Sequence, residues 1–187
     1  GFERIKINAV LIRGQSDENM PELLAFSRRY GAVLRLIEYM PIGIDEYWTQ
    51  ERFVPIDEAQ RRLEAAGHRV EPLPDSEKPI GGGPANYWRV TTPAGDSQTV
   101  GFVAALTHNF CAGCNRVRLT ADGRLRECLS EGGHSSLRDA MRRGEDDAFL
   151  LAMIERSLYG KVSGHGFDAA TPGGGLAARL PMSSLGG

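Results

Sequence analysis

The sequence has little imbalance of charge, no long apolar run and few cysteines. Its 22 Lys and Arg residues and 24 Asp and Glu residues give a formal net charge of −2, so the chain offers no general basic field for nucleic acid. No apolar run approaches the roughly 18 residues that a membrane helix needs. The three cysteines are too few, and odd in number, for a disulfide framework, and clustered thiols suit a reducing compartment. We therefore expect a cytoplasmic globular protein that binds neither nucleic acid nor a membrane.

The chain also lacks an initial methionine. It opens on Gly1-Phe2-Glu3-Arg4 and enters an apolar, β-rich stretch at once. Complete proteins seldom begin inside an element of secondary structure. We therefore expect that an N-terminal portion of a longer protein is missing, and that this portion is a partner of the chain.

The three cysteines that are present lie close together, at Cys111, Cys114 and Cys128. Between the second and the third, residues 115–127 alternate polar and apolar side chains on both sides of a turn at Ala121-Asp122-Gly123. This pattern predicts a β-hairpin. Such a hairpin would return Cys128 toward the Cys-x₂-Cys pair, so that three thiols converge.

Three convergent thiols suit two kinds of metal centre. One is a zinc ion completed by His108 or His134, and the other is a [4Fe–4S] cluster that leaves one iron open for a substrate atom. Unrelated buried cysteines and a reversible Cys111–Cys114 redox pair are further alternatives. The spacing by itself leaves zinc and the cluster as close competitors.

Two arginines follow the Cys-x₂-Cys pair directly. Arg116 and Arg118 are two residues apart on the predicted strand and therefore project from the same face. Guanidinium groups match the oxygens of phosphate, so the pair favours a phosphorylated substrate beside the metal. The simpler alternative is a solvated strand face.

The rest of the chain predicts a mixed α/β protein. Strands over 5–12 and 33–39 with a helix over 19–30 between them form a β-α-β crossover, and we expect the first strand to be buried on both faces. Pro/Gly-rich stretches separate the later elements. These are helices over 56–66, 137–143 and 145–158, a strand over 68–73, and a hairpin of strands over 87–92 and 98–106.

Four motifs together resemble the GTP cyclase family of molybdenum cofactor biosynthesis, the MoaA family of radical S-adenosylmethionine enzymes. The motifs occur in the family's order, and they are KINAV (6–10), RLIEYMP (35–41), CAGCNRVRLTADGRL (111–125, closed by Cys128) and MSSLGG (182–187). The resemblance extends over nearly the whole chain.

The resemblance implies a fold class of α/β plus α+β. Residues 1–45 would be the last β-α units of an incomplete TIM-like radical S-adenosylmethionine barrel. Residues 46–160 would form a C-terminal domain of antiparallel strands and helices that carries the cluster. Residues 161–187 would be a Gly-rich tail that ends in Gly-Gly.

The resemblance also implies a role for particular residues. The three cysteines would hold a [4Fe–4S] cluster whose open iron takes the guanine of GTP. Contacts to GTP would come from Lys6, Arg116, Val117 and Arg118. The S-adenosylmethionine pocket would include Arg35 and the backbone of Met40, and the terminal Gly186 and Gly187 would reach the active site. The family is often dimeric, so a homodimer is also expected.

The chain departs from the family in one respect. The Cys-x₃-Cys-x₂-Cys motif that cleaves S-adenosylmethionine is absent from these 187 residues. In the family, a 5′-deoxyadenosyl radical removes the ribose 3′ hydrogen of GTP, and C3′ then attacks C8 of guanine. The resemblance therefore implies a lyase. We expect this chain alone to be inactive.

Overall fold

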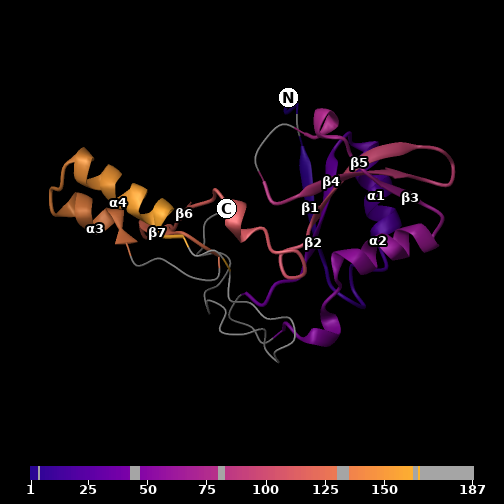
Figure 1. The fold of residues 1–187 in the computed structure, drawn as a ribbon, viewed down its shortest axis with the longest axis horizontal. Helices are drawn as coiled ribbons and strands as arrows, with labels where there is room; N and C mark the ends of the chain where they lie inside the picture. Colours follow the sequence, from indigo (N-terminus) through magenta and orange to yellow (C-terminus); the bar gives the residue numbers. More distant parts are fainter. Residues whose placement is uncertain (4, 43–46, 80–82, 130–134, 162–163, 165–187) are drawn as a thin grey trace. The chain divides into compact units, whose positions relative to one another are not determined.

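A computed structural model of the chain describes residues 1–3, 5–42, 47–79, 83–129, 135–161 and 164 (Figure 1). The chain divides into two compact units. The first comprises Gly1–Met40 and Gln50–Asn109, and the second comprises Pro41–Thr49 and Phe110–Gly187. The expected mixture of helices and strands is confirmed. The domain boundaries at residues 45 and 160 stay a prediction.

The first unit is built on a five-stranded sheet with the order β1-β2-β5-β4-β3. Strands β1, β2 and β5 are parallel, whereas β4 and β3 are antiparallel to their neighbours. The β-α-β crossover and the β4–β5 hairpin are confirmed, but the sequence did not predict that β5 pairs with β2. The strands are β1 (Lys6–Leu11), β2 (Val33–Glu38), β3 (Arg69–Pro72), β4 (Asn86–Thr91) and β5 (Ser97–Val103).

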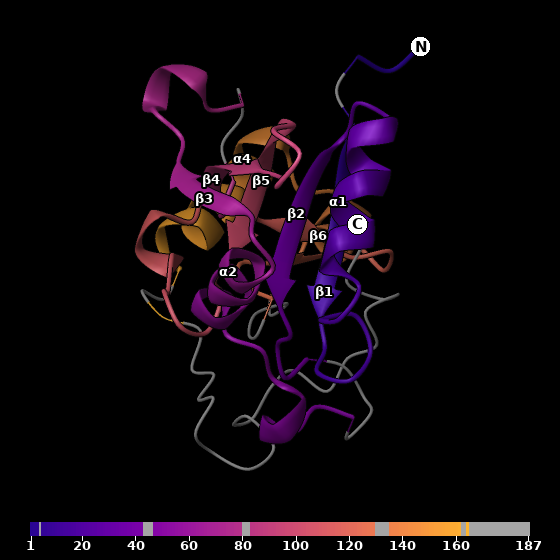
Figure 2. The same cartoon turned by 90° about the vertical axis from the view of Figure 1, so that its right-hand side faces the viewer.

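Two helices, α1 (Met20–Arg29) and α2 (Ile56–Ala65), cover one face of this sheet (Figure 2). Pro21 stands in the first turn of α1, where its missing N–H costs nothing, and Gly31 leaves the helix at a φ of +61°. Short 3₁₀ turns are η1 (Gln50–Arg52) and η2 (Asp75–Glu77). The core between helices and sheet includes Leu11, Leu24, Leu34, Leu36, Ala59, Leu63, Val90, Val100 and Phe102.

The expectation that the first strand is buried on both faces is wrong. In the described chain β1 lies at the edge of the sheet and pairs with β2. Lys6, Asn8 and Val10 are exposed, whereas Leu11 is fully buried. The composition of β1 is therefore that of a buried strand, although among the described residues β1 pairs with a strand on one side only.

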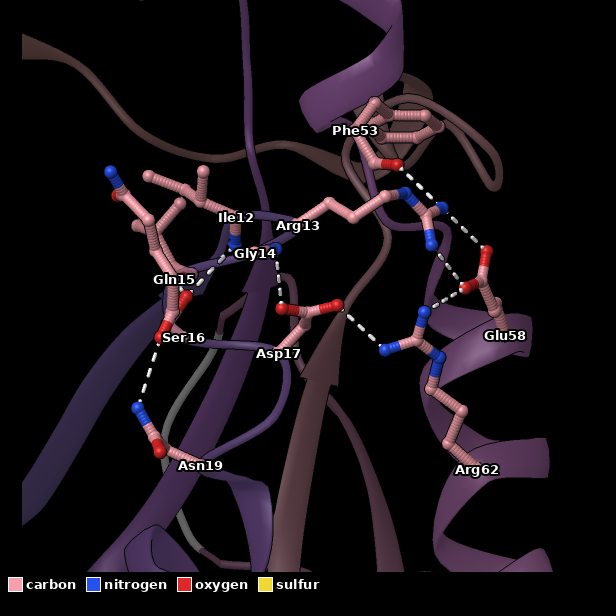
Figure 3. A network of polar contacts seen from close by, with 11 residues as sticks. Ile12, Arg13, Gly14, Gln15, Ser16, Asp17, Asn19, Phe53, Glu58 and Arg62 are labelled. Atoms are coloured by element: carbon pink, nitrogen blue, oxygen red, sulfur yellow. Dashed lines mark hydrogen bonds and ion pairs between the residues drawn. The ribbon is translucent and has the colours of Figure 1, made fainter.

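A cluster of charged side chains fastens α2 to the loop between β1 and α1 (Figure 3). Arg13 donates to both carboxylate oxygens of Glu58, at 2.7 and 2.8 Å. Arg62 lies 2.7 Å from Glu58 and 2.6 Å from Asp17. Asp17 is only 3% exposed and also accepts from the N–H of Gly14 at 2.8 Å. The buried carboxylate is thus fully engaged, as a buried charge requires.

The second unit has a three-stranded sheet with the order β6-β7-β8, and its helices α3 and α4 pack against β7. Ser136 caps α3 by accepting from the N–H of Asp139, and Asp146 caps α4 by accepting from the N–H of Phe149. Among the described residues, no helix has the length and apolar character to cross a membrane. The elements are η3 (Cys111–Gly113), β6 (Arg118–Leu119), β7 (Arg124–Arg126), β8 (Ser135–Ser136), α3 (Leu137–Arg142) and α4 (Asp147–Tyr159).

Candidate metal and substrate site

The first two cysteines share one tight turn. Cys111 begins the 3₁₀ helix η3, and the N–H of Cys114 donates to the Cys111 carbonyl at 3.0 Å. Both thiols are half-buried, as is Cys128, and none of the three forms a disulfide. The turn therefore presents two accessible thiols from one short backbone segment.

The hairpin returns the third cysteine toward this turn. Arg118 pairs with Arg126 across β6 and β7. Cys128 lies two residues beyond Arg126, and Arg116 lies two residues before Arg118, so the register turns Cys128 back toward Arg116. The predicted hairpin is confirmed. However, among the described residues no three side chains from His, Cys, Asp and Glu are grouped as a metal site requires.

Cys114, Arg116 and Arg118 occupy one half-buried face of the segment, and the intervening Val117 and the residue after Arg118, Leu119, are exposed. This alternation agrees with the sequence. The expected strand from residue 115 is nevertheless too long, because β6 begins at Arg118. The carbonyl of Arg116 accepts from a lysine side chain instead of a strand.

That lysine is Lys161, which no pattern in the sequence singles out because it opens a Gly- and Ala-rich stretch. Its Nζ also lies 3.5 Å from the Sγ of Cys114. Burial raises the pKa of the Cys114 thiol, but the N–H of Arg116 and the positive charges of Lys161 and Arg116 outweigh it, so the pKa lies below its usual value. The surroundings favour the thiolate, the form that binds metal.

The C-terminal end of α4 contacts both arms of the cysteine segment. Lys161, directly after the helix cap at Gly160, holds the arm with Cys114. Ser157, 4% exposed, donates to the Oε1 of Glu127 at 2.5 Å, beside Cys128. The helix thus limits how far the two arms can separate.

Two candidate residues of the first unit, Lys6 and Arg35, lie on the sheet face opposite its helices. Asn8 pairs with Arg35 in the register, and the Nε of Arg35 donates to the Oδ1 of Asn8 at 2.7 Å. Lys6 shares this face but begins β1, whereas Met40 follows the carboxyl end of β2. Parallel sheets bind ligands beyond their carboxyl ends, and Lys6 lies at the opposite, amino end of β1. Its proposed contact with GTP stays a prediction.

A residue that sequence reasoning missed is Glu38, the last residue of β2. It is fully buried, and its carboxylate accepts from the N–H groups of Ile56, Leu106 and Thr107 at 3.0, 2.7 and 3.0 Å and from the Thr107 hydroxyl at 2.5 Å. A charged residue at the end of an apolar strand was the available signal. Glu38 joins β2 to the start of α2 and to the segment after β5.

Of the two histidines of the zinc hypothesis, the structure describes His108 only. The Nε2 of His108 lies 3.0 Å from the Oδ1 of Asp57, so zinc binding through that nitrogen would break this contact. His134 lies outside the described residues, as do Gly186 and Gly187. The Nε2 of His108 is therefore engaged by a carboxylate and is not available to zinc in this arrangement.

The donor set by itself fits an iron–sulfur cluster. Three thiols on one hairpin, with a cation beside one of them, supply soft anionic ligands and leave a fourth position to a substrate. Because the thiols are not yet grouped as ligands, we expect binding to gather them, as metal binding commonly orders its ligands. The neighbouring arginines supply positive charge for an anionic substrate.

Comparison with known proteins agrees with these features. The family model described as "Molybdenum Cofactor Synthesis C" matches residues 32–167. A GTP 3′,8-cyclase of Mycolicibacterium smegmatis is 37% identical over all of this chain and 50% of its own length. The GTP 3′,8-cyclase of Rhizobium etli strain CIAT 652 is 40% identical over 98% of this chain and 51% of its own length. The chain thus spans about half the length of the curated relatives that it matches.

Proposed function

The chain belongs to the Molybdenum Cofactor Synthesis C family, and from this premise we propose that it serves as the C-terminal part of a GTP 3′,8-cyclase. The observation that carries the proposal is the Cys-x₂-Cys-x₁₃-Cys hairpin, with Arg116 and Arg118 on the face of Cys114. Relatives named GTP 3′,8-cyclase align over this whole segment.

In this proposal Cys111, Cys114 and Cys128 hold a [4Fe–4S] cluster. When bound, the cluster supplies an iron with an open position for a ligand atom of GTP. The antiparallel hairpin folds the segment with Cys128 back alongside the segment with Cys114. The C-terminal end of α4 contacts both segments. Lys161 favours the thiolate of Cys114 and so favours capture of iron.

The remaining candidate residues would contact the substrate or S-adenosylmethionine. Arg116, Val117 and Arg118 of the second unit, and Lys6 of the first unit, would contact GTP. Met40 and Arg35 would belong to the binding site for S-adenosylmethionine in the whole enzyme. Gly186 and Gly187 would complete the active site.

Two further parts of the proposal concern assembly. The edge strand β1 would receive the remaining part of the barrel, because an edge strand offers unpaired backbone groups to a further strand. The whole enzyme would form a homodimer. Both expectations concern partners of the chain and need the longer polypeptide for a test.

The test of the cluster is its composition. The 187-residue chain, purified without oxygen and reconstituted with iron and sulfide, should be brown and contain about four iron and four sulfide per chain, as a cubane cluster requires. Cys128→Ser should lose most of this iron. The control Ser97→Ala, which changes a residue of β5 in the first unit, should retain it. A colourless protein with one zinc ion would instead support the Cys₃His alternative.

The test of activity uses the same chain. Without a Cys-x₃-Cys-x₂-Cys motif in its sequence, it should form no 5′-deoxyadenosine from S-adenosylmethionine, with or without GTP. Formation of 5′-deoxyadenosine by the purified 187-residue chain would contradict this part of the proposal.

A further inference from the structure

Two arginines face each other directly across the cysteine hairpin. Arg118 of β6 and Arg126 of β7 are partners in the antiparallel register. Directly opposed residues of an antiparallel pair project from the same face, with their Cβ atoms about 5 Å apart. Arg116 lies two residues before Arg118 and shares its half-buried side of the segment. Three guanidinium-bearing residues therefore belong to one face of a short hairpin.

Arg126 is buried to an unusual degree for an arginine. It is 5% exposed, and within the described part of the chain its Nε has no hydrogen-bond partner. Arg124, two residues earlier on the same strand, is different because its Nε donates to Asp122 at 3.1 Å. Arg138 likewise donates to Asp139 at 2.9 Å. The neighbouring arginines thus have carboxylate partners, and the Nε of Arg126 does not.

This arrangement is unfavourable for the hairpin in isolation. A buried charged group needs hydrogen-bond partners to offset its loss of hydration, and like charges directly opposite each other destabilise a strand pair. No hydrogen bond from the Nε of Arg126 to another described residue offsets either cost. An anion that accepts hydrogen bonds from Arg126 and Arg118 would offset both costs at once.

We propose that Arg126 is a third phosphate-binding residue, which acts with Arg118 and Arg116 on the oligophosphate of a nucleoside triphosphate. The inference rests on the proposed function for the identity of the nucleotide, but not for the anion site itself. An oligophosphate suits the site better than a single carboxylate because three arginines belong to one face of the hairpin and each guanidinium can bind two oxygens. Arg126 would hold the phosphate chain while the cysteines define the metal end of the hairpin.

The first experiment compares stability without ligand. Arg126→Met keeps most of the side-chain volume and removes the buried charge, so it should raise the melting temperature of the phosphate-free 187-residue chain. Arg124→Met is the matched control on the same strand and should lower the melting temperature or leave it unchanged, because it breaks the pair with Asp122. A lower melting temperature for Arg126→Met would show that the charge has a structural partner, and would overturn the proposal.

The second experiment measures binding by calorimetry, with inorganic tripolyphosphate, GTP and guanosine as ligands. Arg126→Met should weaken tripolyphosphate and GTP about tenfold or more, which is the loss expected for a hydrogen bond between charged groups. Arg126→Lys should weaken them less, and Arg124→Met should leave both unchanged. Unaltered tripolyphosphate affinity in Arg126→Met would overturn the proposal, even if the variant is more stable.

The tripolyphosphate measurement is repeated on iron-free protein. If the chain binds no cluster but Arg126→Met still weakens tripolyphosphate, the cluster proposal fails and the phosphate site stands. If the cluster forms and GTP binds, but neither Arg126 variant changes the affinity of any phosphate ligand, the phosphate site fails and the cluster proposal stands.

Discussion

At the scale of single residues, Gly123 is where the cysteine hairpin meets α3. Its carbonyl accepts from the N–H groups of Leu137 and Arg138, at 2.9 and 3.3 Å. Its φ is +79°, and a Cβ built on it would lie 2.5 Å from the Cβ of Arg138. The turn therefore needs glycine for both its backbone conformation and its close contact with the helix.

Gly123→Ala should destabilise the chain by about 2–4 kcal/mol, the sum of a left-handed alanine and an overpacked contact. Gly144→Ala is the matched control, because its φ is +82° but a Cβ there would meet nothing within 4 Å. The control should cost about 1 kcal/mol, the backbone part alone. Urea unfolding followed by circular dichroism would compare the two, and equal losses would contradict the proposed contact.

Lys161 allows a second prediction at this scale. Its removal in Lys161→Met should raise the pKa of the Cys114 thiol, which burial otherwise raises and Lys161 helps to lower. A smaller fraction of thiolate at pH 7.5 should slow the alkylation of Cys114 by iodoacetamide in iron-free protein. Mass spectrometry of the labelled peptides would give the rate, with Cys128 in the same sample as an internal control. An unchanged rate at Cys114 would argue against the contact.

At the scale of elements, two carboxylates hold α2 in place. One is Glu58 within the helix, and the other is Glu38 at the end of β2. The hydrogen bond from Arg13, opposed by burial and aided by the charges of Arg13 and Arg62, lowers the pKa of Glu58 from 4.5 to about 2. Between these values the unfolded chain binds more protons than the folded chain. The stability from Glu58 is therefore fully present above pH 4.5 and is lost as the pH falls through 2.

Glu58→Gln should accordingly reduce the loss of stability between pH 5 and pH 3. The effect should be about 1 kcal/mol at most, because water screens a pair this exposed. Urea midpoints at the two pH values would measure it. Glu64→Gln, exposed on the same helix, should behave like the unaltered chain, and an equal effect of both variants would contradict the role of the Arg13 pair.

The second carboxylate is that of Glu38, which anchors the start of α2 from β2. Glu38→Ala would leave the buried N–H groups of Ile56, Leu106 and Thr107 without their acceptor, and should cost about 3–5 kcal/mol. Glu38→Gln keeps the shape and one acceptor oxygen, and should cost less. Thermal and urea unfolding would test the order. A loss below about 1 kcal/mol in Glu38→Ala would show that water or other groups replace the carboxylate.

The elements also show what the sequence could and could not predict. Local signals in the sequence predicted α1, α3 and the two hairpins, because a glycine at a turn, a serine before a helix and alternating side chains each act over a few residues. The pairing of Leu34 with Val100 has no such signal, since it depends on packing between distant segments. The face of Arg116 and Arg118 could be predicted, but the late start of β6 could not. The carbonyl of Arg116 accepts from Lys161, 45 residues away, and no local pattern indicates that contact.

At the scale of the whole molecule, the proposed cluster ligands and the five-stranded sheet belong to different compact units. Removal of iron by a chelator should therefore raise hydrogen exchange in residues 110–129 and 135–161, where the ligands and their supports lie. Strands β2 and β5 should keep their protection. Peptide-resolved hydrogen exchange with and without chelator would test this, and equal deprotection in both units would contradict separate responses.

The outer edge of β1 has a consequence for any study of the chain. In the described part of the protein no strand pairs with that edge, and the exposed Val10 and Ile5 lie along it. β3, at the opposite edge, has a charged pair of Arg69 with Glu71 and ends at Pro72, features that discourage further strand addition. At high concentration the chain should therefore self-associate through β1. The substitution Val10→Lys should keep it monomeric.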